Sequence, residues 1–138
     1  MKFKETTIRV LVRKNYGECF DFYTQKLGLH VVWGDRNGPY TSFAAEPQEE
    51  PCFAIFLGDA MPMFQGYVQP DTEKQPDTVT AVIPTDDLDQ DYCRLKEAGV
   101  VFLGDPQFIE AWGMRCTYFR DPEGNLFELN DASVYCMS

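Results

Sequence analysis

Histidine is nearly absent from this chain: the 138 residues include one, His30. Basic residues are also few, since 12 Lys and Arg stand against 22 Asp and Glu, giving a formal net charge of −10. A chain with this charge repels phosphate backbones and anionic lipid surfaces, so we expect neither nucleic acid nor a membrane among its partners. A neutral or cationic small molecule is the easier ligand to attract.

The sequence also lacks paired cysteines and long apolar runs. Five cysteines are scattered without any Cys-x-x-Cys spacing, which disfavours a disulfide framework or a zinc ribbon. No stretch approaches the roughly 18 uncharged apolar residues of a membrane span, and no apolar segment follows the charged start, as it would in a secretory signal. We therefore expect a reduced, cytoplasmic protein.

Apolar residues are plentiful, at 44% of the chain, with 14% aromatic. This composition provides ample material for a buried core and argues against disorder. The length suits one domain, which could itself consist of two small repeated halves.

The first half of the chain predicts the order β-α-β-β-β. Residues 8–12 alternate as in a strand. From Tyr16 to Leu27 apolar residues recur every three or four positions, as on one face of a helix that Gly28 ends. Three more strands are predicted over residues 29–33, 40–44 and 52–57.

The second half repeats this order. A strand is predicted over residues 79–83, and Asp86 or Asp87 can cap a helix that Gly99 ends. Three further strands are predicted over residues 100–103, 114–119 and 125–129. The chain thus reads as one domain made of two similar modules.

Proline and glycine interrupt the segment between the two halves, so we predict module one over about residues 1–60, a linker over 61–75 and module two over about 76–131. Each module alone would be a helix on a short sheet with one uncovered face. Two modules, or two subunits, can bury such faces and leave a curved cleft lined by sheet.

Three segments carry a resemblance to a known family: residues 22–29, 95–100 and 112–129. The last ends in Asp121-Pro122-Glu123-Gly124-Asn125-Leu126-Phe127-Glu128-Leu129. With these motifs the chain resembles the glyoxalase/bleomycin-resistance/extradiol-dioxygenase group, also called the vicinal oxygen chelate superfamily. The resemblance implies an α+β fold of two βαβββ modules that form sheet-lined clefts, in a homodimer. It is less specific for function, because the superfamily spans metal enzymes and metal-free binding proteins.

In the metal enzymes, the resemblance implies a His, Gln or Glu on the first strand, a His on the strand that opens the second half, and a Glu on the last strand. Glu128 matches the last position. The first falls within residues 7–9 and the second at Thr78 or Thr80, none of which is a strong ligand. We therefore expect no metal ion and no other cofactor. The alternative is a carboxylate supplied from a shifted register, by Glu5, Asp77 or another acidic residue.

Glu128 has two interpretations. It can act in an aromatic cleft, as a general base with a raised pKa or as the partner of a ligand cation. It can equally be a rim or dimer-contact residue neutralised by an arginine such as Arg9 or Arg115. His30 does not fall at a ligand position of the family, and a lone histidine on a strand is more often a surface residue.

Aromatic residues beside turns are the other candidates for a ligand pocket. Trp33, Tyr40 and Trp112 each neighbour a turn or a glycine and can cover an opening, and aromatic faces bind flat molecules and organic cations. With Glu128 they form the predicted ligand-binding set. A single His in this position provides no Ser/His/Asp arrangement, so catalytic residues stay unassigned.

The function predicted from these features is a metal-independent binding protein of the glyoxalase/bleomycin-resistance type. It would sequester an aromatic or cationic small molecule, as a homodimer. The alternative is a metal-dependent lyase, isomerase or dioxygenase of the glyoxalase superfamily that uses Glu128. The sequence leaves open whether any reaction is catalysed.

Overall fold

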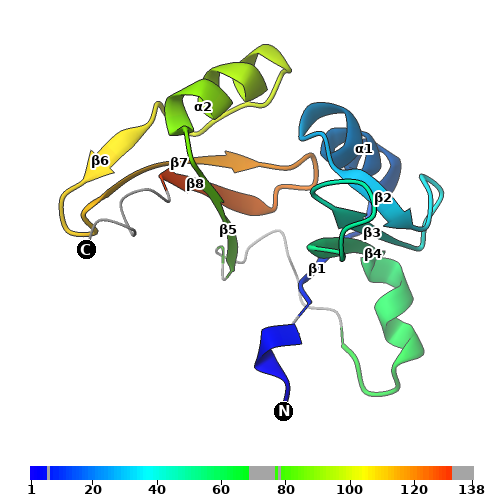
Figure 1. Ribbon diagram of the computed structural model, residues 1–138. Coiled ribbons are helices and arrows are strands. Elements are labelled where there is room, and N and C mark those ends of the chain that lie inside the picture. The colour runs from blue at the N-terminus through cyan, green and yellow to red at the C-terminus, as the bar shows by residue number, and fades with distance from the viewer. Residues whose placement is uncertain (6, 69–76, 78, 132–138) are drawn as a thin grey trace. The chain divides into compact units, whose positions relative to one another are not determined.

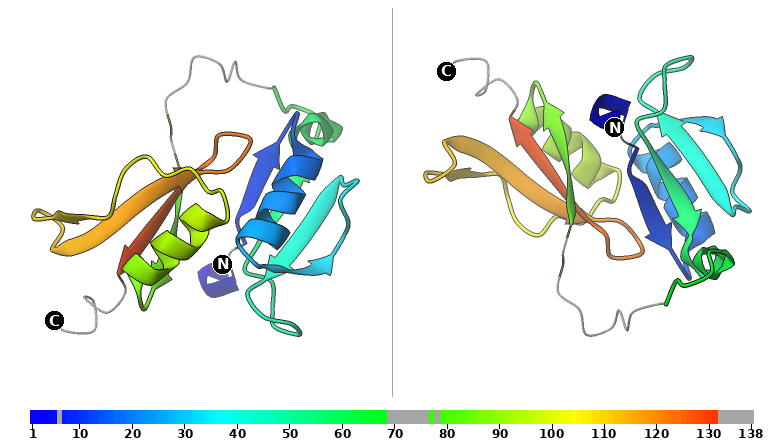
Figure 2. Two further views of the ribbon diagram at one scale, coloured as in Figure 1. Left: turned by 90° about the horizontal axis from the view of Figure 1, so that it is seen from above. Right: turned by 90° about the horizontal axis from the view of Figure 1, so that it is seen from below.

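The computed structural model describes residues 1–5, 7–68, 77 and 79–131. It divides into two compact units, Met1–Gln75 and Pro76–Ser138, called here the N-terminal and C-terminal units (Figure 1). Each unit contains one four-stranded sheet with a helix across one of its faces, as Figure 2 shows for each unit taken by itself.

The N-terminal sheet has the strand order β1-β4-β3-β2, with β1 parallel to β4 and the other neighbours antiparallel. Its strands are β1 (Arg9–Val12), β2 (His30–Trp33), β3 (Tyr40–Ala44) and β4 (Phe53–Leu57). The helical elements are η1 (Phe3–Glu5), α1 (Tyr16–Asp21), the π-helical continuation η2 (Phe22–Lys26) and the 3₁₀ helix η3 (Gly58–Met63). Gly28, with φ of +77°, follows η2 in the left-handed conformation that glycine adopts readily.

Aromatic rings fill the space between this sheet and its helix. Tyr23 and Phe43 are fully buried, with ring centroids 5.6 Å apart, and Tyr23 also meets Phe53 at 4.9 Å. Side chains alternate between the two faces of a strand. Residues at even positions of β3 and β4 therefore point to the opposite face, called here the far face.

The C-terminal unit repeats this topology with the order β5-β8-β7-β6, and β5 lies parallel to β8. Its elements are β5 (Thr80–Thr85), α2 (Leu88–Glu97), β6 (Gln107–Ile109), β7 (Met114–Arg120) and β8 (Leu126–Asp131). The α2 helix begins where the side chain of Asp87 accepts a hydrogen bond of 3.1 Å from the backbone N–H of Gln90, as predicted for an N-cap.

A second set of rings packs beneath α2. Tyr92 of α2 meets Phe102 with centroids 4.7 Å apart, Phe102 meets Phe119 at 5.7 Å, and Phe119 stacks on Phe127 at 5.2 Å. Phe119 and Phe127 thus mark the helix-facing side of β7 and β8. The far face of this sheet carries the alternate residues of each strand.

The strand predicted over residues 100–103 is wrong. That segment meets β7 at a single bridge, Phe102 to Phe119, and the sheet's edge strand is β6, over Gln107–Ile109. Pro106 has no backbone N–H to give to a ladder, so regular pairing with β7 starts only after it. The predicted β-α-β-β-β order is still correct, because β6 lies between α2 and β7, where the strand over residues 100–103 was expected.

The α+β class and the two βαβββ modules are thereby confirmed. Residues 69–75 of the predicted linker lie outside the described residues, as do Pro76, Thr78 and Cys136. None of the helices in the described ranges has the length and apolar character needed to cross a bilayer.

Candidate functional site

An aromatic surface occupies the far face of the N-terminal sheet. The rings of Trp33 and Tyr40 lie with centroids 5.8 Å apart at 51°, and Tyr40 meets Phe56 edge-on at 6.3 Å. The guanidinium carbon of Arg9 lies 5.4 Å from the centroid of Tyr40, within cation–π range. Together these four residues line a shallow pocket of 410 Å³, called here the aromatic pocket. Its volume lies in the range of small-molecule sites.

Trp33 reaches this face because β2 is irregular. His30 pairs with Ala44 and Val31 with Phe43, but Trp33 pairs with Ser42, so Val32 is an extra residue in the strand. A regular ladder would have placed Trp33 opposite Thr41, on the side that faces α1. The bulge thus sends the Trp33 side chain to the far face.

The turn between β2 and β3 sets the distance between Trp33 and Tyr40. Gly34 has φ of +94°, and a Cβ atom there would collide with the carbonyl oxygen of Tyr40. Only glycine allows the backbone at residue 34 to approach the backbone of Tyr40 this closely. The predicted turn is therefore what brings Trp33 and Tyr40 together.

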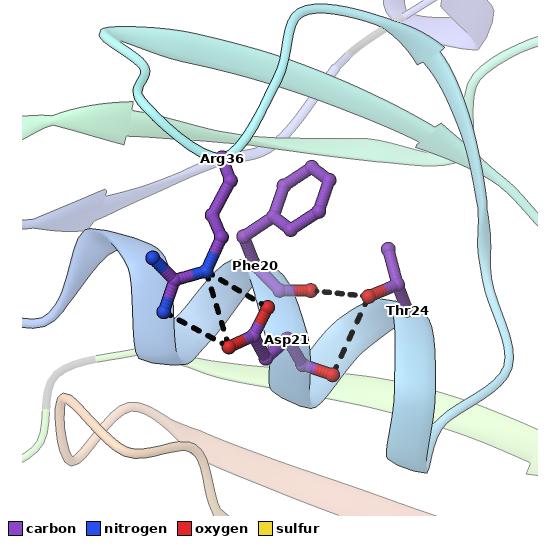
Figure 3. A network of polar contacts seen from close by, with 4 residues as sticks. All are labelled: Phe20, Asp21, Thr24 and Arg36. Atoms are coloured by element: carbon purple, nitrogen blue, oxygen red, sulfur yellow. Dashed lines mark hydrogen bonds and ion pairs between the residues drawn. The ribbon is translucent and has the colours of Figure 1, made fainter.

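An ion pair fastens this turn to the helix (Figure 3). The guanidinium of Arg36 donates from Nε to both carboxylate oxygens of Asp21, at 3.1 and 3.2 Å, and from a terminal nitrogen at 3.0 Å. One turn along the helix, the hydroxyl of Thr24 donates to the carbonyl of Phe20 at 2.8 Å. Because Arg36 lies between β2 and β3, the pair links the turn that joins these strands to the helix on the other face of the sheet.

A buried hydroxyl pair supports the same turn from the helix side. Thr41 donates to the carbonyl of Asp35 at 3.0 Å, so Tyr16 must be the donor in its 2.6 Å hydrogen bond with Thr41. Burial raises the pKa of Tyr16 above 10.0, its ordinary value, and the hydrogen bond to Thr41 opposes that shift. The phenol therefore stays protonated as a donor at neutral pH.

The C-terminal unit has a smaller pocket of 140 Å³, beside β6 and β7. Trp112, 55% exposed, and Tyr118 are its aromatic residues, and Cys116 also lines it. Trp112 stands in the turn between β6 and β7, where Gly113 has φ of +66°. Trp112 thus stands beside a glycine turn and lines this pocket.

Glu128 lies on the far face of the same sheet, 5% exposed. Its Oε1 accepts a short hydrogen bond from the hydroxyl of Tyr118, the residue paired with it across β7 and β8. Its Oε2 accepts from the side-chain amide of Asn130, at 3.1 Å. Burial, and then the bond to Glu128 and its charge, raise the pKa of Tyr118.

Arginine does not neutralise Glu128 in the described part of the chain. Arg115 lies on the helix-facing side of β7 and donates to both oxygens of Asp89 in α2, at 2.8 and 2.9 Å. That pairing lowers the pKa of Asp89. No ion pair among the described residues includes Glu128, and Arg9 lies by Tyr40.

The structure brings the four predicted residues into two groups. Trp33 and Tyr40 share the aromatic pocket, while Trp112 and Glu128 are each next to Tyr118, in the C-terminal unit. His30 is exposed on β2, as expected of a surface residue. Sequence reasoning did not identify Phe56 or Asn130, and it did not place Arg9 beside Tyr40 or Tyr118 beside Glu128. The turn at residues 121–125 was a usable signal for Tyr118, since counting outward from it pairs Tyr118 with Glu128.

Thr80, the described residue at the family's second metal position, is a poor ligand for a metal ion. Thr80 uses its hydroxyl to donate to the carbonyl of Leu126, at 3.2 Å, and Val82 is the β5 residue opposite Glu128. In the described ranges, no three His, Cys, Asp or Glu side chains gather as a metal-binding group. Asp77, proposed for a shifted register, instead pairs with Arg120 at 2.7 and 2.8 Å.

Comparison with known proteins gives relatives of different kinds. The YraH protein of Bacillus subtilis, described as uncharacterized, is 28% identical over 127 residues, which cover 88% of this chain and 93% of YraH. Among solved structures, TnmS3, an antibiotic binding protein of a Streptomyces species, matches with a TM-score of 0.59 and 23% identity, over 92% of this chain and 95% of TnmS3. A lactoylglutathione lyase of Agrobacterium tumefaciens matches with a TM-score of 0.64 and 16% identity, over 95% and 96%. At these identities the two structures share the fold with this chain, and they differ in what they are described as doing.

The family model described as "Glyoxalase/Bleomycin resistance protein/Dioxygenase superfamily" matches residues 6–129, nearly the whole chain. This match confirms the resemblance seen in the sequence motifs. The chain belongs to the glyoxalase/bleomycin-resistance/dioxygenase superfamily.

Proposed function

We propose that this protein binds an aromatic small molecule without a metal ion and holds it unchanged. The aromatic pocket carries the proposal, because Trp33 and Tyr40 present tilted rings with Arg9 at 5.4 Å. Trp33 is 63% exposed, so its face is available to a flat ligand. Arg9 adds a positive charge, which favours an aromatic ligand with an anionic substituent over an organic cation at this pocket.

Two further observations support binding over metal chemistry. The donor set around Glu128 is weak, since its neighbour on β5 is Val82, and Thr80, at the family's second metal position, pairs with Leu126. A protein with this fold, TnmS3, is described as an antibiotic binding protein, so the fold is compatible with binding of a small molecule.

Naphthalene-2-sulfonate, a flat aromatic anion, is a suitable probe of the aromatic pocket. In a Trp112→Phe background, Trp33 is the only tryptophan left and its fluorescence reports on the probe directly. We expect saturable quenching in the presence of a chelator, and recovery of the probe unchanged by chromatography. Binding that appears only after zinc, nickel, manganese or iron is added, or conversion of the probe, would contradict the proposal.

We also propose that the chain forms a homodimer. Several apolar side chains of the C-terminal unit are exposed and could be covered by a partner: Val101, Leu103 and Phe108. Light scattering on the eluting protein should give twice the chain mass of 15.8 kDa. A mass equal to that of one chain would contradict the dimer.

We also propose that the protein works in the reducing environment of the cytoplasm. The described cysteines, which are free, are compatible with that environment.

A further inference from the structure

The far face of the C-terminal sheet holds a group of buried hydrogen-bond acceptors, one of which has no donor. Glu128 is 5% exposed and Asn130 is 3% exposed. Glu128 receives one hydrogen bond on each oxygen, from Tyr118 and from Asn130. The side-chain oxygen of Asn130, Oδ1, is buried and has no hydrogen-bond partner in the described part of the chain.

The orientation of the Asn130 amide follows from its neighbour. An ionised carboxylate only accepts hydrogen bonds, so the amide must turn its NH₂ group toward Glu128. Its oxygen is then directed elsewhere, and reversing the amide would set two acceptors against each other. The unpaired atom is therefore an acceptor and not a donor.

The unpaired oxygen of Asn130 and the buried carboxylate of Glu128 each lower the stability of the fold unless another group interacts with them. A buried acceptor without a donor, and a buried carboxylate without a cation, each lose the solvation that water provides. No lysine, arginine or histidine forms an ion pair with Glu128 among the described residues. A ligand that brings both a positive charge and several N–H donors would compensate for the two together.

A small pocket lies one strand away from these two residues and is lined by their cross-strand partners, not by Glu128 or Asn130 themselves. Tyr118 and Cys116, which line the pocket with Trp112, are the cross-strand partners of Glu128 and Asn130. The pocket volume of 140 Å³ suits a small group and not a bulky one. Trp112 can cover the group with an aromatic face, which also attracts cations.

From this geometry we infer that Glu128, Asn130 and Tyr118 form a recognition site for a primary ammonium group on a short stem. The ammonium donates to the carboxylate of Glu128 and to Oδ1 of Asn130, while Trp112 covers the stem. Tyr118 is a positioning residue, because its hydroxyl orients the carboxylate. The inference rests on the proposed small-molecule binding and adds the chemical class of the group that the C-terminal unit selects.

Three related probes test the site: 2-phenylethylamine, 2-phenylethanol and the N,N,N-trimethyl derivative of the amine. The alcohol lacks the charge, and the trimethyl compound keeps the charge without any N–H donor. In a Trp33→Phe background, Trp112 is the only tryptophan and its fluorescence reports binding in the C-terminal unit. We expect the affinity for the amine to be at least about tenfold higher than for either analogue, because its hydrogen bonds to the site are charge-assisted.

Glu128→Gln should remove this preference, because it keeps the shape and loses the charge. Glu97→Gln removes the same charge from an exposed position at the end of α2 and should leave the preference intact. Binding of naphthalene-2-sulfonate, measured with Trp33 present, verifies that each variant is folded. If Glu128→Gln fails to fold, the three probes measured on the protein that retains Glu128 still test whether the site prefers a primary ammonium group.

Equal affinity for the amine and its trimethyl derivative would overturn the inference, since the site would then detect charge and not N–H donors. Retained naphthalene-2-sulfonate binding with no preference for the amine would overturn it while leaving the proposed function in place. Loss of binding for all the probes, naphthalene-2-sulfonate included, would overturn both. Stabilisation by a divalent metal chloride but not by the amine would also overturn both.

Discussion

The two units share a topology and differ on their far faces. In each, a tyrosine of the third strand pairs across to the fourth strand: Tyr40 with Phe56, and Tyr118 with Glu128. The partner is apolar and half-buried in the first case, and acidic and buried in the second. The repeated topology thus sets where a side chain can stand, and the residue at each position decides the chemistry.

The two units should be alike in their cores, between each sheet and its helix, where both contain a fully buried phenylalanine. Phe43 and Phe119 are both fully buried, one in each unit, so Phe43→Ala and Phe119→Ala should each lower the free energy of unfolding by about 3–5 kcal/mol. Denaturant unfolding followed by circular dichroism measures both losses. A loss below about 1 kcal/mol in one of them would mean that the two cores are not equivalent.

Substitutions on the far faces should separate the units by ligand. Trp33→Ala should weaken naphthalene-2-sulfonate about tenfold and leave 2-phenylethylamine unchanged, and Trp112→Ala should do the reverse. Both side chains are more than half exposed, so the melting temperature should change little in either variant. Isothermal titration of each variant with each probe gives the four affinities. Weakening of both probes by either single substitution would break the separation.

Alkaline pH should lower the stability of the fold through two tyrosines whose pKa is raised, Tyr16 and Tyr118. Burial raises the pKa of Tyr16 and Tyr118 above the unfolded value of 10.0, so each keeps its proton in the folded state after the unfolded chain has lost it. Their contribution to stability is complete below pH 10 and is lost as the pH rises above it. Tyr118 also faces the Glu128 carboxylate, so Tyr118→Phe should reduce the alkaline loss of stability more than Tyr16→Phe does. Unfolding curves from about pH 8 to about pH 11 measure this, and equal reductions would count against a special role for Glu128.

Loss of the ion pair between Arg36 and Asp21 should have the smallest effect on stability and on probe affinity. The side chain of Arg36 is 57% exposed and that of Asp21 is 35% exposed, and ion pairs this open to solvent add little to stability. Arg36→Gln should therefore leave the melting temperature nearly unchanged while weakening naphthalene-2-sulfonate less than Trp33→Ala does. Its matched control is Arg94→Gln, which breaks an exposed pair in α2 and should not affect this probe. A weakening by Arg94→Gln equal to that by Arg36→Gln would show that charge, and not the position of the turn, matters.

Periodicity and turn residues were enough to predict most of the fold. The helix from Tyr16, the Asp87 cap and the turn that ends at Asn125 are local features with local signals, and each is present. The strand over residues 100–103 failed because apolar character does not show whether a partner strand runs alongside. Pairing there depends on where the chain turns after Gly104, which is a property of the tertiary structure.

The candidate site was less predictable for the same reason. Glu128 was identified by its motif, but its partners depended on the side of the strand that each neighbour occupies. Arg115 and Tyr118 are three residues apart on β7, so they lie on opposite faces, and only Tyr118 shares the face of Glu128. The place of Trp33 depended on an extra residue in β2, which no alternation pattern reveals.

That extra residue has a consequence for the behaviour of the protein at high concentration. β2 is one of the two edge strands of its sheet in the described part of the chain, and Val31, Val32 and Trp33 are all exposed there. A straight apolar edge is a template on which another chain can extend the sheet and aggregate. The bulge at Val32 breaks the regular spacing of backbone donors and acceptors along that edge. The irregularity that turns Trp33 toward the aromatic pocket therefore also helps to keep the protein from aggregating.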